Sequence, residues 1–279
     1  MRLVTWNINS VRLRLPLLKR LALETNPDIV CLQETKVEDR LFPKDAIAEL
    51  GFVHQAFLGQ KSYNGVAILS KRPLDGIEVR NWCGRADCRH LIVALEDGTQ
   101  IHNIYIPAGG DIPDPEQNDK FAHKLSFLEE LAGWYESAYR KSDKLILVGD
   151  FNVAPLENDV WSHKQMQKII SHTQEEVERL NAFQATLDFI DAPRHFVPHD
   201  LKLYTWWSYR SADWTASDRG RRLDHVWVTK PLQEALAGSL VVREARGWTQ
   251  PSDHVPLVVD FYESGSSEIG APFRLRLKT

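Results

Sequence analysis

The feature that most constrains the fold is a short apolar run at residues 145–148, Leu-Ile-Leu-Val, which ends at Gly149 and is followed by Asp150 and Asn152. Such a run is typical of a strand buried on both faces and is too short to span a membrane. Residues two apart in extended backbone point to the same side, so both polar side chains are expected to leave the strand together. Alone, the pattern favours a strand followed by an Asx turn.

Polar side chains also end two strands near the start of the chain. Residues 2–9 predict a first strand with Asn7 and Asn9 on one face, and residues 28–34 predict a second strand that ends at Glu34. The segment between them has the pattern of a helix, so the two strands are expected to be parallel. The carboxyl ends of parallel strands lie side by side, which is where α/β proteins usually form their sites.

Three helices have recognisable starts. Pro16 suits the first turn of a helix with an apolar stripe at Leu17, Leu18, Leu21 and Leu23. Asp119 is expected to cap a second helix. Residues 173–176, Thr-Gln-Glu-Glu, form a capping box that predicts the start of a third.

Later strands end in polar residues too. A hairpin is predicted over residues 91–106, and its second strand ends near Tyr105. Residues 223–228 predict a strand that contains Asp224. Asp253 and His254 directly precede the last predicted strand.

The composition is that of an ordinary globular protein, with 43% hydrophobic and 26% charged residues among 279. We expect one domain over residues 1–262 and a C-terminal extension over residues 263–279. No signal peptide or membrane span is predicted. The three cysteines are an odd number without metal-ligand spacing, which favours reduced thiols, so a cytoplasmic location is expected. The net charge of −4 excludes a generally basic nucleic-acid coat protein.

Two segments combine basic and aromatic side chains. The turn at residues 61–65 is able to clasp a phosphate backbone, although a plain turn is favoured on these residues alone. Residues 204–222 place arginines among aromatic side chains, which suits stacking on bases and pairing with phosphates, while a solvated loop is an equal alternative. The candidate contacts are Lys61, Tyr63, Asn64, Trp206, Arg210 and Arg221.

The strand-end groups offer mainly oxygen atoms, with one histidine and no cysteine. This chemistry suits Mg²⁺ or Mn²⁺ far better than Zn²⁺, and a hard cation held by one or two carboxylates is a usual device of phosphoryl transfer. The set comprises Asn7, Asn9, Glu34, Tyr105, Asp150, Asn152, Asp224, Asp253 and His254.

An ordered series of motifs resembles exonuclease III, the bacterial-type apurinic/apyrimidinic endonuclease of the endonuclease/exonuclease/phosphatase superfamily. Each motif is weak alone, but their order over residues 2 to about 262 is specific. The resemblance implies an α/β fold, a four-layered sandwich of two mixed β-sheets packed face to face with helices outside. The motifs are Trp6-Asn7-Ile8-Asn9, residues 32–36, Tyr105-Ile106-Pro107, Gly149-Asp150-Phe151-Asn152, residues 204–207, Leu223-Asp224 and Ser252-Asp253-His254.

The resemblance also implies a metal site. Glu34 would be the principal ligand of Mg²⁺, which Mn²⁺ would be able to replace. Asn7 would lie beside it, and Asn9 in or near the metal shell. Asp253 stands where the family has an acid close to the metal.

The remaining roles implied by the resemblance are catalytic. Asp150 would orient or deprotonate the attacking water, and Asn152 would position that water or the phosphate. His254, held by Asp224, would donate to a non-bridging phosphate oxygen; whether His254 or Asp150 takes the proton stays open, and we favour Asp150. Tyr105 would donate to the phosphate or to the leaving oxygen.

Two departures from the family pattern concern the substrate. Ala108 stands where the family usually has Asn, and Arg221 stands where relatives often have an apolar or aromatic residue. Trp206 and Leu223 would help to wall a pocket for an extruded abasic sugar. Arg221 would alter the shape of that pocket, and its charge is able to pair with a phosphate, which would favour exonuclease activity or 3′-end cleaning.

The resemblance therefore implies a Mg²⁺-dependent DNA-repair nuclease. It would cut duplex DNA on the 5′ side of abasic sites, leaving a 3′-hydroxyl, with 3′→5′ exonuclease and 3′-end-cleaning activity. We expect a monomer whose partner is double-stranded DNA with abasic sites or blocked 3′ ends, and no membrane partner. The alternatives are a phosphoesterase acting on a small or lipid phosphate, and a non-catalytic DNA-binding module.

Overall fold

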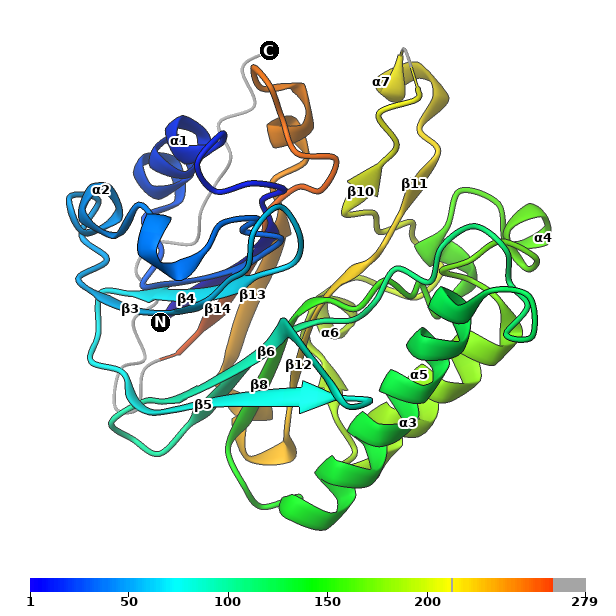
Figure 1. The fold of residues 1–279 in the computed structure, drawn as a ribbon, viewed down its shortest axis with the longest axis horizontal. Coiled ribbons are helices and arrows are strands. Elements are labelled where there is room, and N and C mark those ends of the chain that lie inside the picture. The colour runs from blue at the N-terminus through cyan, green and yellow to red at the C-terminus, as the bar shows by residue number, and fades with distance from the viewer. Residues whose placement is uncertain (212, 263–279) are drawn as a thin grey trace.

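Two six-stranded mixed sheets form the centre of the computed structural model, which describes residues 1–211 and 213–262 (Figure 1). The predicted C-terminal extension lies outside these residues. The first sheet has the order β13 (Leu236–Val241), β14 (Leu257–Phe261), β1 (Arg2–Asn7), β2 (Ile29–Gln33), β4 (Val66–Ser70), β3 (His54–Leu58). The second has the order β5 (Asp75–Trp82), β6 (Arg85–Ala94), β7 (Gln100–Tyr105), β8 (Leu145–Asp150), β12 (Asp224–Val228), β9 (Ile190–Asp191).

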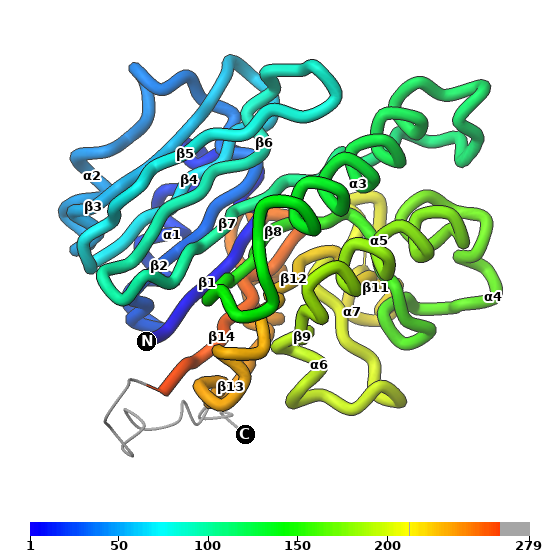
Figure 2. The backbone as a smooth tube through the Cα atoms, turned by 90° about the horizontal axis from the view of Figure 1, so that it is seen from below, coloured from blue at the N-terminus to red at the C-terminus, as the bar shows by residue number. Residues whose placement is uncertain are grey.

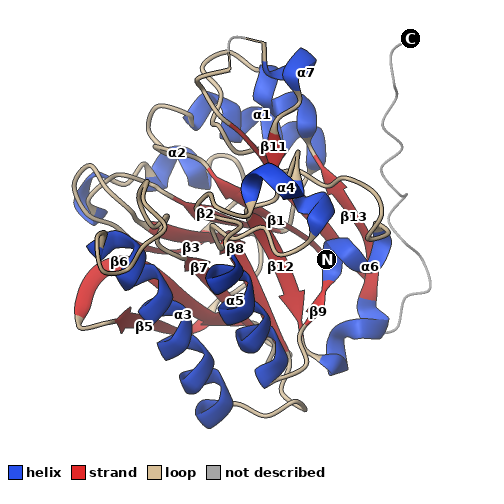
Figure 3. Ribbon diagram, turned by 90° about the vertical axis from the view of Figure 1, so that its right-hand side faces the viewer, coloured by secondary structure: helices blue, strands red, loops and turns tan. Residues whose placement is uncertain are grey.

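The sheets pack face to face with helices on their outer sides. Figure 1 shows α1 (Leu15–Thr25) and α2 (Lys44–Ala48) beyond the first sheet. Figure 3 shows α3 (Asp119–Ala138) and α5 (Gln174–Thr186) side by side over the second. Seen from below in Figure 2, β5 and β6 overlie strands of the first sheet. The expected four-layered α/β sandwich is confirmed.

The core between the sheets is aliphatic. Both sheets contribute to it, because alternate residues of each strand point to this inner face. It includes Leu3, Ile68, Val93, Val148 and Val226, all fully or almost fully buried.

The remaining helices are short: α4 (His163–Met166), α6 (Ala192–Phe196) and α7 (Trp214–Ser217). The last of these lies between β10 (Trp206–Trp207) and β11 (Gly220–Arg221), which pair with each other as an antiparallel ribbon. Figure 1 shows this ribbon and α7 standing out from the body of the fold, and we call residues 204–222 the arm. None of the helices described is both long and apolar enough to cross a bilayer.

Several local predictions are confirmed. The first two strands pair in parallel, the hairpin of β6 and β7 forms, and the Thr173 side chain closes the expected capping box with Glu176. Both predicted strands at the N-terminus are shorter than expected, because they end at Asn7 and Gln33.

Two details of the helices were predicted wrongly. Leu23 is 76% exposed, because at about 100° per residue it lies roughly 240° around the helix from Leu17. Asp119 does not cap α3. Asn118 does, since its backbone is extended and its side chain accepts a hydrogen bond from the Lys120 N–H.

Candidate active site

Strand register brings the predicted catalytic groups to one edge of the second sheet. Asp150, the last residue of β8, lies opposite Tyr105 in the parallel pair with β7 and opposite Asp224 in the antiparallel pair with β12. Gly149 is essential here, because its φ is +140° and a Cβ would lie 1.9 Å from the Ile104 oxygen. Close approach of β8 to β7 therefore positions Asp150.

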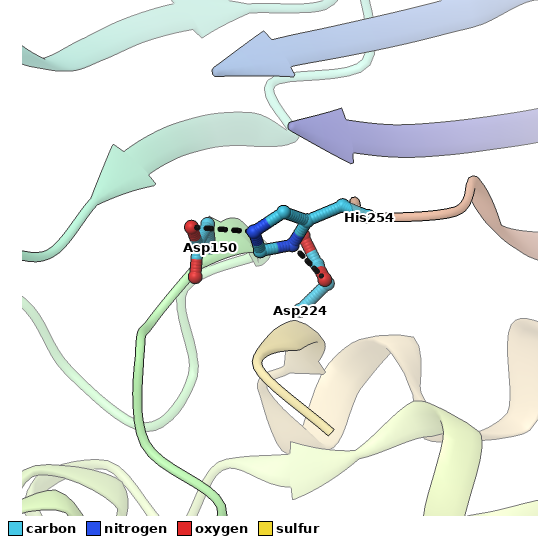
Figure 4. A group of neighbouring side chains, drawn as sticks. All are labelled: Asp150, Asp224 and His254. Atoms are coloured by element: carbon cyan, nitrogen blue, oxygen red, sulfur yellow. Dashed lines mark hydrogen bonds and ion pairs between the residues drawn. The ribbon is translucent and has the colours of Figure 1, made fainter. Parts of the chain in front are cut away.

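His254 lies between two buried carboxylates (Figure 4). Its Nδ1 is 2.8 Å from Asp224 Oδ2, and its Nε2 is 3.6 Å from Asp150 Oδ2. Burial would lower the pKa of His254, but the two carboxylates raise it to about 10. Burial and the charge of Asp224 raise the pKa of Asp150 to about 7, against the effect of the His254 cation. The group thus holds an imidazolium next to a carboxyl that titrates near neutrality.

Asn7 and Glu34 continue this network from the first sheet. The Asn7 amide donates to Glu34 Oε1 and to Asp150 Oδ2, each at 2.9 Å, and Tyr105 OH donates to Glu34 Oε1 at 2.7 Å. Burial and the nearby carboxylates raise the pKa of Tyr105, which therefore stays a donor. Asn7 joins the two carboxylates across the sheets, and its predicted role as a metal ligand stays a prediction.

Lys36 occupies the space between two predicted metal ligands. Its ammonium lies 2.7 Å from Glu34 Oε2 and 2.7 Å from Asn9 Oδ1. Burial opposes ionisation of Glu34, but this ammonium and the hydrogen bonds from Asn7, Lys36 and Tyr105 lower its pKa. Two oxygens thus converge where a positive charge is stabilised, so the donor set fits a small hard cation that would take the place of the ammonium.

Asp253 belongs to the same edge. It accepts hydrogen bonds from the Asn9 amide at 3.2 Å and from Trp206 Nε1 at 3.0 Å. Tyr209 also reaches this corner, because its hydroxyl lies 3.4 Å from the Asn9 amide and accepts from Arg14 at 3.0 Å. The arm is therefore attached directly to the predicted metal side of the site.

One cluster among the described residues has the composition of a metal site. It consists of Asp150, Asp224 and His254, whose potential ligand atoms all lie within 4.8 Å of one another. A cation bound there would have to displace the proton shared between His254 and Asp224. The Glu34 side offers oxygen atoms without a competing imidazolium. Its chemistry therefore fits Mg²⁺ or Mn²⁺ better.

Several residues of the site have left-handed backbone. Asn9, Glu34, Lys36 and Asn152 all have φ between +48° and +53°, a region that non-glycine residues seldom adopt. The expectation that Asn152 continues the extended strand was therefore wrong. The Asx turn that the pattern favours on its own is confirmed: the Asn152 N–H donates to Asp150 Oδ1 at 2.9 Å, and the Asn152 amide donates to the Ile106 carbonyl.

A buried ion pair between two helices stabilises this turn. Lys124 of α3 and Glu176 of α5 are both fully buried and bonded to each other. The Lys124 ammonium also donates to the Asn152 carbonyl at 2.7 Å and to the Ala108 carbonyl at 3.3 Å. The Asn that the family usually has at position 108 is absent, but the backbone there is held by this lysine.

The predicted DNA contacts fall into two groups. Lys61 and Tyr63 are exposed, and their turn adjoins the Glu34 segment through a hydrogen bond from the Lys36 N–H to the Asn64 carbonyl. Arg210 is exposed on the arm. Leu223 is buried and packs with Trp206, while Arg221 is half-buried and stacks over the Trp206 ring with its Cζ 4.9 Å from the ring centre.

The sequence pattern did not single out several residues that shape the site. Lys36 lies in the motif at residues 32–36, but the position of its ammonium depends on left-handed backbone at Glu34 and at Lys36 itself. Arg14, Tyr209 and Lys124 act through contacts between distant segments. The one usable signal in the sequence was the position of Lys124 on the apolar face of its helix.

Comparison with known proteins agrees with this geometry. The model of the endonuclease/exonuclease/phosphatase family matches residues 4–254. Exodeoxyribonuclease III of Haemophilus influenzae is 28% identical over 271 residues, covering 94% of this chain and 100% of the relative.

Solved structures agree as well. An AP endonuclease from Archaeoglobus fulgidus has a TM-score of 0.87 and 30% identity, covering 94% of this chain and 99% of the other. A 3′ phosphatase from Neisseria bound to a product DNA hairpin has a TM-score of 0.86 and 30% identity, covering 94% and 100%.

The α/β sandwich and the family match define a hydrolase of the metal-dependent phosphoester-cleaving class. The chain belongs to the endonuclease/exonuclease/phosphatase family, and the resemblance to exonuclease III and the AP endonucleases is confirmed.

Proposed function

We propose that this protein is a Mg²⁺-dependent DNA-repair nuclease. It hydrolyses the phosphodiester 5′ to abasic sites in duplex DNA, leaves a 3′-hydroxyl, and removes blocking groups and nucleotides from 3′ ends. Residues 1–262 act as a single catalytic domain and as a monomer in the cytoplasm. The relatives named exodeoxyribonuclease III, AP endonuclease and 3′ phosphatase support this proposal.

The observation that carries the proposal is the buried pair of Asp150 and His254, 3.6 Å apart, held between Asp224 and the Asn7 amide. Hydrolysis of a phosphodiester by water needs a proton acceptor for the water and positive charge on the phosphate oxygens. The carboxyl supplies the first and the imidazolium the second, and neither needs to move far.

Each remaining residue has a place in this reaction. Asp150 accepts the proton of the attacking water, and Asn152 orients the water or the phosphate. His254 donates to a non-bridging phosphate oxygen, with its ring orientation fixed by Asp224. Tyr105 keeps its proton near neutral pH and donates it, as a hydrogen bond, to the phosphate or to the leaving 3′ oxygen.

A divalent cation held by Glu34, with Asn7, Asn9 and Asp253 as its further predicted neighbours, would supply Lewis-acid stabilisation of the phosphate charge. Mg²⁺ is the proposed ion, with Mn²⁺ as a substitute.

The substrate is duplex DNA because aromatic and basic side chains flank this edge on both sides. Lys61, Tyr63 and Asn64 adjoin the Glu34 segment, and Arg210 lies on the arm. Trp206 and Leu223 pack together beside this edge and would wall the proposed sugar pocket. A phosphoesterase for a small or lipid phosphate would use the same catalytic groups, but it would not need this exposed basic and aromatic rim.

The test is cleavage of an end-labelled duplex that carries one abasic-site analogue, with Mg²⁺ or with EDTA. We expect a single cut that needs the metal and is lost in Asp150→Asn. The matched control is Asp188→Asn, an exposed carboxylate whose ion pair with Lys141 is remote from the site. Turnover of soluble phosphate esters together with indifference to the duplex would overturn the proposal, and so would metal-independent binding without cleavage.

A further inference from the structure

Arg221 joins the arm to the neighbouring loop that contains Ile170 and Ser171. Its Nη1 donates to the Ile170 carbonyl at 3.1 Å and to Ser171 Oγ at 3.0 Å, while its guanidinium covers the Trp206 ring. Its Nε is buried and has no hydrogen-bond partner among the described residues. A cationic side chain therefore joins these segments with part of its hydrogen-bonding capacity unused.

Hydrogen bonds fix the segments on both sides of Arg221. The Ser171 N–H donates to both carboxylate oxygens of the buried Glu176, at 2.9 and 2.8 Å. On the other side, Trp206 Nε1 donates to Asp253 Oδ2, and the backbone of Trp206 bridges to that of His254. The contacts thus run from Ser171 through Arg221 and Trp206 to Asp253 and His254, so Arg221 is joined to the catalytic edge through the Trp206 ring.

We infer that Arg221 makes this site favour a terminal 3′-phosphate over an internal phosphodiester that joins an abasic sugar. This inference rests on the proposed function. An internal substrate carries a sugar and a continuing strand beyond the scissile phosphate, and on this inference both would have to fit beside Trp206 and the guanidinium that covers it. A 3′-phosphate has nothing beyond its phosphorus.

The charge of a 3′-phosphate favours it over an internal diester, as its smaller size does. A terminal phosphate monoester carries about −1.5 to −2 charges near pH 7, as other phosphate monoesters do, whereas an internal diester carries one. The guanidinium beside Trp206 attracts the doubly charged group more strongly.

The favoured reaction balances without another reactant. Water adds its oxygen to the phosphorus, and the bond between phosphorus and the 3′ oxygen breaks. The 3′ oxygen leaves as a hydroxyl, and the phosphorus leaves as inorganic phosphate. The proton lost by the water is equivalent to the one gained by the 3′ oxygen.

The experiment compares two duplexes under single-turnover conditions with Mg²⁺, one with a nick that ends in a 3′-phosphate and one with an internal abasic-site analogue. For wild-type protein we expect faster removal of the 3′-phosphate. In Arg221→Ala the ratio of the two rates should shift by about tenfold toward the internal substrate, a change of about 1.4 kcal/mol. Arg221→Gln, which retains most of the side-chain volume, should shift the ratio less.

A binding measurement separates specificity from a general loss of structure. In EDTA, wild-type protein should bind the nick with a 3′-phosphate more tightly than the nick with a 3′-hydroxyl, and Arg221→Ala should lose that difference. The matched control is Arg80→Ala, which removes an arginine stacked 4.7 Å over Trp134, outside the site. Its ratios should equal those of wild type.

The outcomes are distinguishable. If wild-type protein cuts both duplexes and neither Arg221 variant changes the rate ratio or the binding difference, the inference is wrong while the proposed function stands. A wild-type preference for the internal substrate has the same meaning. If wild-type protein cuts neither duplex with any divalent cation, the proposed function fails and takes the inference with it.

Discussion

Removal of the Lys124 ammonium should damage both the stability of the fold and the geometry of the site. The lysine and its partner Glu176 are fully buried, so Lys124→Met leaves a carboxylate without its cation in the interior. Removing one member of a buried ion pair costs about 3–5 kcal/mol. We expect a loss in that range in the free energy of unfolding, measured with urea through the fluorescence of the nine tryptophans.

A double variant tests whether the stability loss comes from the unpaired charge of Glu176. Glu176 keeps three other donors, the backbone N–H groups of Ser171 and Thr173 and the Thr173 hydroxyl. Adding Glu176→Gln to Lys124→Met removes the unpaired charge, so the double variant should be about 1–3 kcal/mol more stable than the sum of the single losses predicts.

The single variant Lys124→Met should also affect catalysis, because Lys124 donates a hydrogen bond to the Asn152 carbonyl. We expect kcat for abasic-site cleavage to fall while KM changes little, and Lys124→Arg to restore part of kcat. Strictly additive stability losses, or a fully active Lys124→Met protein, would refute the reasoning that this pair holds the catalytic turn.

Three further results are expected. Gly149→Ala should prevent stable folding, since its Cβ would meet the Ile104 carbonyl at 1.9 Å, whereas Gly133→Ala, with nothing within 4 Å in α3, should raise the unfolding free energy by about 1 kcal/mol; equal effects in urea unfolding would contradict this. Burial lowers the pKa values of His102 and His225 to about 3, so each is neutral when folded and charged when unfolded below about pH 6.5. Stability should therefore fall as the pH drops from 6.5 toward 3, by up to about 1.4 kcal/mol per pH unit for each histidine. His225→Gln should make that slope shallower, and an unchanged slope would show that His225 is not the cause.

The sequence was a good guide to the layers and to the strand-end site, for a physical reason. A polar residue at the end of a buried strand has its position fixed by sheet register, and register follows from the apolar pattern. Asp150, Asp224 and Tyr105 meet because β7, β8 and β12 are neighbours. The ordered motifs then indicated which strands those would be.

What the pattern could not give depends on backbone turns and distant contacts. The pattern left two conformations open for Asn152, extended backbone and an Asx turn, and its positive φ, which turns its N–H toward Asp150, shows the second. Lys36 follows two residues after Glu34, and only left-handed backbone at both positions brings its ammonium onto the carboxylate. Arg221 was expected to alter a pocket, but its bonds to Ile170 and Ser171 join segments 50 residues apart in the chain.

The most direct test of the account separates the role of Glu34 from that of Asp150. Single-turnover cleavage of an abasic duplex is measured for wild type, Glu34→Gln and Asp150→Asn over a wide range of Mn²⁺ concentrations. If Glu34 holds the cation and Asp150 accepts the proton, Glu34→Gln should recover activity as Mn²⁺ rises, and Asp150→Asn should stay inactive at every concentration. An Asp150→Asn protein restored by Mn²⁺, or a Glu34→Gln protein with wild-type metal dependence, would contradict the account.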